Sequence, residues 1–201
     1  MGFKAWETPP DFFKALDEEF HFTLDAAASH ENALCKFYLT TEGMFARTYD
    51  GEGYIDLALP DQDGLSYPWT GHRVFCNPPY DSSLYQWVEK ATKREAEVAV
   101  LLLPPDVDVK WYGLLQDQFY DRTFTSLQVF GKTRWRGHHN SDDSFALLTM
   151  KGRLRFWHPA LRIGFRMIDY TQRGEDIFDY SNPHVSGDSP RAGNLLAIFR
   201  R

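Results

Sequence analysis

The residues with the clearest chemical potential are Asn77, Pro78, Pro79 and Tyr80, which directly follow the apolar run Val74-Phe75-Cys76. Neither proline can donate a hydrogen bond to a sheet, and the ring of Pro78 favours an extended Asn77, so we expect a strand that ends at Cys76. Asn77 then lies at the carboxyl end of a strand, where open α/β sheets bind their ligands. The motif predicts a rigid set of hydrogen-bond acceptors beside an aromatic ring.

Such a set suits the alkylation of an exocyclic amine whose lone pair is delocalised into a heteroaromatic ring. Hydrogen bonds from the amine to the side-chain oxygen of Asn77 and the carbonyl of Pro78 would favour a pyramidal nitrogen and stabilise its developing charge. Tyr80 would stack on the ring, a contact worth about 1–3 kcal/mol. This chemistry needs no strong general base. The alternative is a surface turn, in which Asn and Pro are both common.

The motif resembles the catalytic sequence of amino-methyltransferases, in which Asn, Asp or Ser, then Pro-Pro and an aromatic residue, occupy the end of the fourth strand. This resemblance implies that Asn77, Pro78, Pro79 and Tyr80 are catalytic and that S-adenosyl-L-methionine is the cofactor.

The first thirty residues predict a helix, a strand and a small-residue loop. Asp11–Leu16 has apolar residues at helical spacing and could be capped by Thr8 or Asp11. Residues 20–24 alternate as a strand does and lead into Asp25-Ala26-Ala27-Ala28, where minimal side chains leave room for a ligand beside the backbone. Asp25 could instead cap a following helix through Asn32 and Leu34.

The order of these segments is similar to that of the phage-type DNA N6-adenine methyltransferases: Trp-x-Thr-Pro from Trp6, Phe-Thr-Leu-Asp-Ala-Ala-Ala from Phe22, Asn-Pro-Pro-Tyr, then Leu-Leu-Pro. The similarity spans roughly residues 6–111. It implies that Asp25 and Ala26 line the methionine end of the cofactor and that Thr8 and Pro9 close over it. The implied cofactor residues are Trp6, Thr8, Pro9, Asp25, Ala26, Ala27 and Asp63. Ala26–Ala28 depart from the glycines that the broader methyltransferase superfamily carries here.

A carboxylate is expected to hold the ribose hydroxyls of the cofactor, as an acidic residue does in dinucleotide-binding folds. The resemblance favours Asp63, within Asp-Gly-Leu and ahead of Trp69, while Asp56 and Glu42 are open alternatives.

Composition predicts one domain over residues 1–201, because 201 residues with 43% apolar content suffice for one core.

The sequence shows no apolar run that could span a bilayer and no signal peptide, so we expect a soluble, cytoplasmic protein, in the host cytoplasm if a phage encodes it. Cys35 and Cys76 lack metal-ligand spacing and are interpreted as free thiols.

Charge is unevenly distributed within the total of −6: residues 1–109 carry a net −11, whereas residues 110–166 carry a net +6. An acidic half joined to a basic segment is typical of an enzyme that binds a polyanion, although a basic face can also simply be solvated.

The densest cationic stretch is Gly131–Asn140, where charges and imidazoles interleave with Trp135. The expected DNA contacts are Lys132, Arg134, Arg136, His138 and Asn140. Adjacent histidines point to opposite sides of a strand, so no metal site is expected at His138-His139.

The fold class that follows is α/β: a Rossmann-like methyltransferase sheet, mostly parallel, with an antiparallel end and a DNA-recognition insertion near residues 120–150. A helix is predicted over Leu84–Ala96 and a strand buried on both faces over Val98–Leu103. Asp106 follows that strand, either beside the active-site mouth or as a cap for a helix near Asp108. Further strands are predicted over Phe124–Phe130, Phe145–Met150, Arg153–Trp157 and Leu195–Phe199, with a long excursion over residues 158–193.

The predicted function is transfer of a methyl group from S-adenosylmethionine to the N6 amine of adenine in DNA, on a base flipped out of a duplex. Methylation of cytosine N4 is the nearest alternative, because both amines fit the same acceptors. Protein glutamine and rRNA guanine methyltransferases also use Asn-Pro-Pro-Tyr. A non-catalytic DNA-binding module of the same fold is the alternative from a different class.

The basic stretch gives a first test. Replacing Lys132, Arg134 and Arg136 together with Ala should weaken DNA binding and flatten its salt dependence, while cofactor affinity stays constant. Each lost phosphate contact lowers the slope of log K against log salt by about 0.9, near 3 in total. An unchanged slope with unchanged methylation would contradict the assignment and redirect attention to Arg162, Arg166 and the residues after Trp157.

Overall fold

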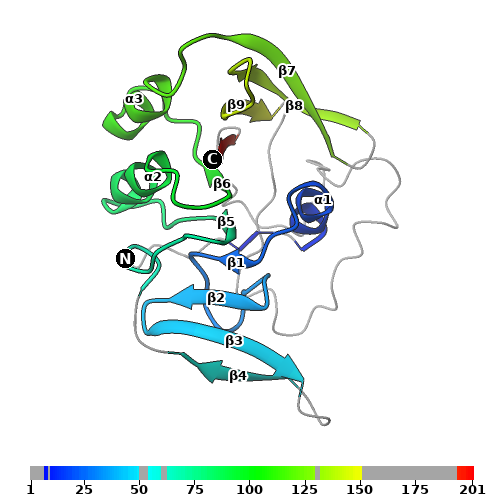
Figure 1. Cartoon of the computed structure of the whole chain (residues 1–201), viewed down its shortest axis with the longest axis vertical. Coiled ribbons are helices and arrows are strands. Elements are labelled where there is room, and N and C mark those ends of the chain that lie inside the picture. The colour runs from blue at the N-terminus through cyan, green and yellow to red at the C-terminus, as the bar shows by residue number, and fades with distance from the viewer. Residues whose placement is uncertain (1–6, 9, 50–53, 60–62, 130–131, 151–193) are drawn as a thin grey trace, which may run out of the picture.

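A computed structural model describes residues 7–8, 10–49, 54–59, 63–129, 132–150 and 194–201 of the chain. Within these residues one ten-stranded sheet runs in the order β4-β3-β2-β1-β5-β6-β10-β9-β8-β7 (Figure 1). The strands are β1 (Leu24–Asp25), β2 (Phe37–Thr40), β3 (Gly43–Tyr49), β4 (Tyr54–Ala58), β5 (Arg73–Cys76), β6 (Val98–Leu103), β7 (Thr123–Val129), β8 (Lys132–His139), β9 (Phe145–Met150) and β10 (Leu195–Arg200).

The sheet has a parallel core between two antiparallel arms. Strands β2, β1, β5 and β6 pair in parallel, whereas β3 and β4 extend one side and β10, β9, β8 and β7 extend the other through antiparallel pairings. The expected antiparallel end is therefore present. The expectation of a mostly parallel sheet is wrong, because hairpins such as β2–β3 and β8–β9 pair neighbours in sequence, and a hairpin is necessarily antiparallel.

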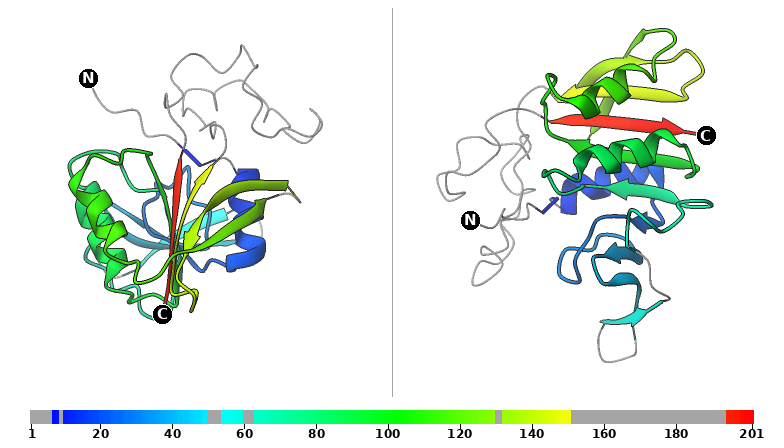
Figure 2. Two further views of the ribbon diagram at one scale, coloured as in Figure 1. Left: turned by 90° about the horizontal axis from the view of Figure 1, so that it is seen from above. Right: turned by 90° about the vertical axis from the view of Figure 1, so that its left-hand side faces the viewer.

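Helices cover both faces of this sheet. Figure 2 shows α2 (Leu84–Thr92) and α3 (Lys110–Gln116) on one face and α1 (Pro10–Phe20) on the other. Strand β6 is buried along its whole length: Ala99, Leu101 and Leu103 belong to the core under α2 and α3, and Val98, Val100 and Leu102 to the core under α1. An uninterrupted apolar run is what burial on both faces requires, so the prediction for Val98–Leu103 is confirmed.

The first helix is longer than the predicted segment Asp11–Leu16. The strand that follows it is shorter than the alternating pattern of residues 20–24 predicts. Helix α1 continues to Phe20, and His21 takes a left-handed φ of 49° that ends it. The carboxylate of Asp17 then accepts the amide of Phe22 at 2.6 Å, so the predicted strand over residues 20–24 is reduced to β1, Leu24–Asp25. Likewise α2 ends at Thr92 rather than Ala96, and Arg94 has a φ of 54°.

The segment expected as a DNA-recognition insertion continues the sheet. Lys132–His139, expected as a connection between strands, is strand β8, which pairs with both β7 and β9. The register of the sheet places four residues at the same level: Leu103 at the end of β6, Leu195 on β10, Thr149 on β9 and Arg136 on β8. Because β8 runs opposite to β6, its first residues extend past the carboxyl edge of the parallel strands.

The predicted strand over Arg153–Trp157 and the excursion over residues 158–193 lie outside the described residues, while the final strand is confirmed as β10. Among the helices described, none has both the length and the apolar character that crossing a membrane requires.

Candidate active site at the carboxyl edge of the parallel strands

A cavity of about 670 Å³ opens at the carboxyl ends of β1, β2 and β5. This size is typical of small-molecule sites. Its walls include residues predicted from three separate motifs and a loop: Thr8, Asp25, Ala26, Ala27, Asp63, Asn77, Pro78, Pro79 and Tyr80. The structure thus brings together every predicted catalytic and cofactor residue that it describes; Trp6 and Pro9 lie outside the described residues.

The Asn77–Tyr80 segment begins directly after β5, as the two prolines predict. Pro78 is buried, Asn77 and Tyr80 are partly buried, and all three line the cavity. The hydroxyl of Tyr80 donates to the backbone carbonyl of Leu102 on β6 at 3.2 Å. Burial raises the pKa of this phenol well above its usual value, so the group stays a neutral donor. The hydrogen bond ties the tyrosine ring to the neighbouring strand.

Asp25 ends β1 with only 4% of its surface exposed. Its Oδ2 accepts the backbone amide of Leu34 at 3.2 Å and its Oδ1 that of Ala27 at 3.5 Å. Burial outweighs these hydrogen bonds and raises the pKa of the carboxyl group from 3.8 to about 6. No helix follows Asp25, because residues 26–36 form turns and bends. The carboxylate holds the cavity wall together and faces the cavity as well.

Gly64 explains how Asp63 reaches the same cavity. A Cβ at position 64 would lie 2.0 Å from the carbonyl oxygen of Ala26 and 2.4 Å from the ring of Trp87. Only a glycine permits this approach. Because Gly64 packs on the end of β1, the preceding carboxylate lies at the cavity edge, where its Oδ1 accepts the amides of Leu65 and Ser66 at 2.9 and 2.8 Å. These bonds, led by that of Ser66, lower the pKa of Asp63.

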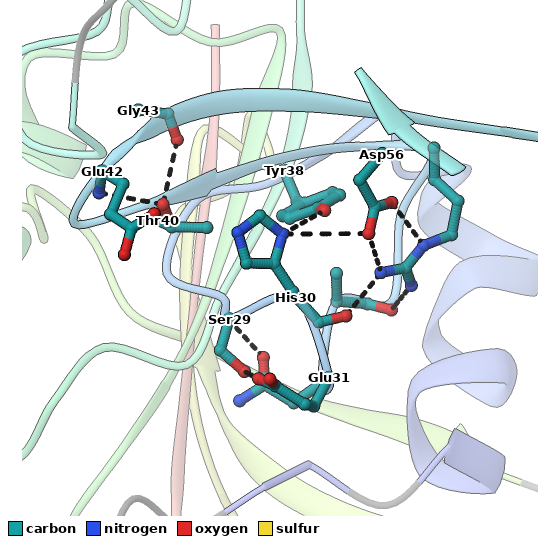
Figure 3. Close-up of polar contacts among 11 residues, drawn as sticks. Ser29, His30, Glu31, Tyr38, Thr40, Glu42, Gly43 and Asp56 are labelled. Atoms are coloured by element: carbon teal, nitrogen blue, oxygen red, sulfur yellow. Dashed lines mark hydrogen bonds and ion pairs between the residues drawn. The ribbon is translucent and has the colours of Figure 1, made fainter. Parts of the chain in front are cut away.

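The three acids considered for a ribose contact occupy different places. Asp63 lines the cavity. Asp56 on β4 binds Arg47 at 2.8 Å, and that hydrogen bond lowers its pKa (Figure 3). Glu42 lies just after β2, where its backbone amide donates to the hydroxyl of Thr40 at 2.9 Å. Neither Asp56 nor Glu42 lines the cavity as described.

Sequence reasoning missed part of the wall. Thr40 and Thr41, at the carboxyl end of β2, line the cavity, as do Ser29 and Asn32 in the turn between β1 and β2. A signal existed for the threonines, because the carboxyl end of the strand next to β1 is a ligand-binding position in open α/β sheets. The turn residues carried none, since their place depends on contacts with β3.

The predicted DNA contacts divide along β8. Arg136 and His138 are exposed, and the ring of His138 lies 6.3 Å from that of Phe124, which is 65% exposed. The side chains of Lys132 and Arg134 are outside the described set. Asn140 is fully buried and donates to the carbonyl of Gln118 at 2.9 Å, so its prediction as a base contact is corrected. Its neighbour His139 binds Asp143 at 2.5 Å.

A family model described as DNA N-6-adenine-methyltransferase (Dam) matches residues 4–60. The matched stretch contains Thr8, Asp25 and the alanines that follow it, and it ends before Asn77. No curated protein gives a significant match to the chain.

The raised pKa of Asp25 generates a prediction about stability. Between pH 3.8 and about 6 the folded protein binds more protons at Asp25 than the unfolded chain does, so this residue's contribution to the free energy of unfolding falls as pH rises through that window. The full effect is on the order of 3 kcal/mol. Urea unfolding of the protein and of Asp25→Asn should show a difference that grows from pH 4 to pH 7 in favour of the variant. A constant difference would contradict the raised pKa.

Proposed function

We propose that the chain is a DNA N-6-adenine-methyltransferase, the family whose model matches residues 4–60, and that the adenine amine meets the methyl donor in the cavity beside Asn77–Tyr80. One observation carries this proposal. The acceptor motif of β5 and the acidic, alanine-rich end of β1 line a single cavity, so a target base and a cofactor can be bound in contact. The parallel core with helices on both faces fits a Rossmann-like methyltransferase sheet.

The residues of the cavity fit S-adenosyl-L-methionine, which carries a methyl sulfonium, an ammonium and a ribose. Asp25 offers a buried carboxylate to the ammonium, and Ala26–Ala28 leave room for the ligand beside the backbone. Asp63 offers a carboxylate to the ribose hydroxyls, and Thr8, which is 7% exposed, closes one side. When bound, this cofactor supplies an electrophilic methyl group.

The chain's own contribution to methyl transfer is to orient the amine and stabilise the charge that develops on it. The side-chain oxygen of Asn77 and the carbonyl of Pro78 accept the two N–H groups of the adenine amine, which favours a pyramidal nitrogen with its lone pair directed at the methyl group. The ring of Tyr80 stacks on the base. Because its hydroxyl is held by Leu102, the ring is oriented before the base arrives.

Double-stranded DNA requires that the adenine be flipped into the cavity, and cations must hold the backbone while this happens. Strand β8 supports such a role for Lys132, Arg134 and Arg136, because its first residues extend past the edge at which the cavity opens. Arg136 and His138 are exposed, and His138 lies beside the exposed Phe124, a combination suited to phosphates and bases.

Replacing Asn77 tests this function directly. Asn77→Ala should lower the rate of methyl transfer to adenine by about 10²–10³, because it removes a transition-state hydrogen bond, and should leave cofactor affinity nearly unchanged. The rate is measured with labelled cofactor and duplex DNA, and the affinity by titration calorimetry.

Asn77→Asp is the matched variant, since it keeps an acceptor oxygen at the same position and should retain more activity than the alanine variant. Wild-type turnover in Asn77→Ala would remove Asn77 from the mechanism.

A further inference from the structure

The wall of the cavity that follows β1 is a turn with little regular structure. Residues 26–34 supply Ala26, Ala27, Ala28, Ser29, Asn32 and Leu34 to the cavity. Two local hydrogen bonds hold the turn: the amide of Ser29 donates to the side chain of Asn32 at 2.6 Å, and the amide of Leu34 donates to Asp25 at the end of β1 at 3.2 Å. Such a segment needs external contacts to keep one conformation, because turns alone fix few dihedral angles.

Arg47 on β3, which does not line the cavity, supplies those contacts. Its guanidinium donates to the backbone carbonyl of Ala33 at 3.3 Å and also to that of His30. These two residues lie on either side of Asn32, and Ala33 immediately precedes Leu34, the partner of Asp25. One planar group therefore holds the backbone on both sides of Asn32, which lines the cavity.

Arg47 is itself fixed by the antiparallel arm. It stands directly opposite Asp56 on β4, and the two side chains meet twice, Nε to Oδ1 at 2.8 Å and Nη2 to Oδ2 at 3.2 Å. This bidentate geometry leaves the remaining N–H groups directed at the turn. The guanidinium also lies 5.2 Å from the centre of the Tyr38 ring.

Tyr38 adds a contact to the same turn. It is fully buried on β2 and pairs in register with Asp25. Its hydroxyl lies 2.8 Å from Nδ1 of His30, whose ring packs edge-on against Phe45 at 4.4 Å. The turn is thus held through two carbonyls by Arg47 of β3, and through the side chain of His30 by Tyr38 of β2 and Phe45 of β3.

We infer that Arg47, fixed by Asp56, is a positioning residue for cofactor binding, setting the turn of residues 26–34 without touching the ligand. The inference rests on the proposed function, because it takes the ligand of this wall to be S-adenosylmethionine. It assigns a role in cofactor affinity to the antiparallel pair β3–β4, whose Arg47 and Asp56 do not line the cavity.

Arg47→Lys is the most direct test, because lysine keeps the charge but lacks the planar set of donors that reaches Asp56 and two carbonyls at once. Affinity for S-adenosylmethionine, measured by titration calorimetry, should weaken roughly tenfold, as the loss of charge-assisted hydrogen bonds implies. In steady-state assays KM for the cofactor should rise, while kcat at saturating cofactor and the affinity for DNA stay close to wild type.

Arg73→Lys is the matched control. Arg73 also donates to a backbone carbonyl, that of Phe20, and lies 3.8 Å from a carboxylate, Glu97, but at the amino end of β5, away from the cavity. The Arg73→Lys variant should lose about as much thermal stability as Arg47→Lys does, and it should keep its affinity for S-adenosylmethionine. If both lysine variants bind S-adenosylmethionine as tightly as the wild type, the positioning role is overturned. If both lose the same cofactor affinity, the effect of Arg47 is one of general stability and the positioning role is likewise overturned.

A wild-type protein that bound no S-adenosylmethionine would instead overturn the proposed function itself, together with this role. If Arg47→Lys fails to fold, Asp56→Asn replaces it, since it keeps Arg47 and weakens its anchor; the same carboxylate also lies 3.8 Å from Nδ1 of His30, within the turn. A loss of cofactor affinity of a few-fold is then expected. Unchanged affinity in Asp56→Asn would contradict the inference.

Discussion

The parallel pairing of β1 with β5 is the constraint on which the site depends. In that pairing Asp25 stands opposite Phe75, so Asn77 follows two residues beyond the point where β1 ends. Parallel strands end at one edge, and the prolines after Asn77 force the chain to leave the sheet there. The carboxylate and the acceptor motif are therefore brought together by backbone hydrogen bonds, before any side-chain contact between them is considered.

The rest of the fold supports that edge from three directions. Strand β6, adjacent to β5, provides the carbonyl that orients Tyr80. Gly64 lets a later loop close on the end of β1 and bring its carboxylate to the cavity. The antiparallel arm of β3 and β4 holds the turn after β1 through Arg47. In the second arm, β10 to β7, the exposed Arg136 of β8 lies level with Leu103 at the carboxyl end of β6.

Local chemistry was enough to predict the parts of the site that proline, burial and small side chains determine. The end of β5 and the fully buried β6 follow from residue types alone, whereas the lining role of Asp25 and Ala26 was implied by the family resemblance. The residue types did not predict which strands pair with one another. The alternation at residues 20–24 competes with helix α1, and residues 132–139 become a strand only because β7 and β9 flank them. The sequence predicts Asn140 as a DNA contact, yet its side chain is buried and donates to the carbonyl of Gln118.

The identity of the methylated base tests the central claim most directly. Duplex DNA is incubated with the protein and S-adenosylmethionine carrying a labelled methyl group, then digested to nucleosides and separated by chromatography. An acceptor pair at Asn77 and Pro78 serving a flipped adenine should place all the label on N6-methyladenine, and the label should disappear with Asn77→Ala. Label on N4-methylcytosine, or none on any base while cofactor binding is intact, would contradict the assignment.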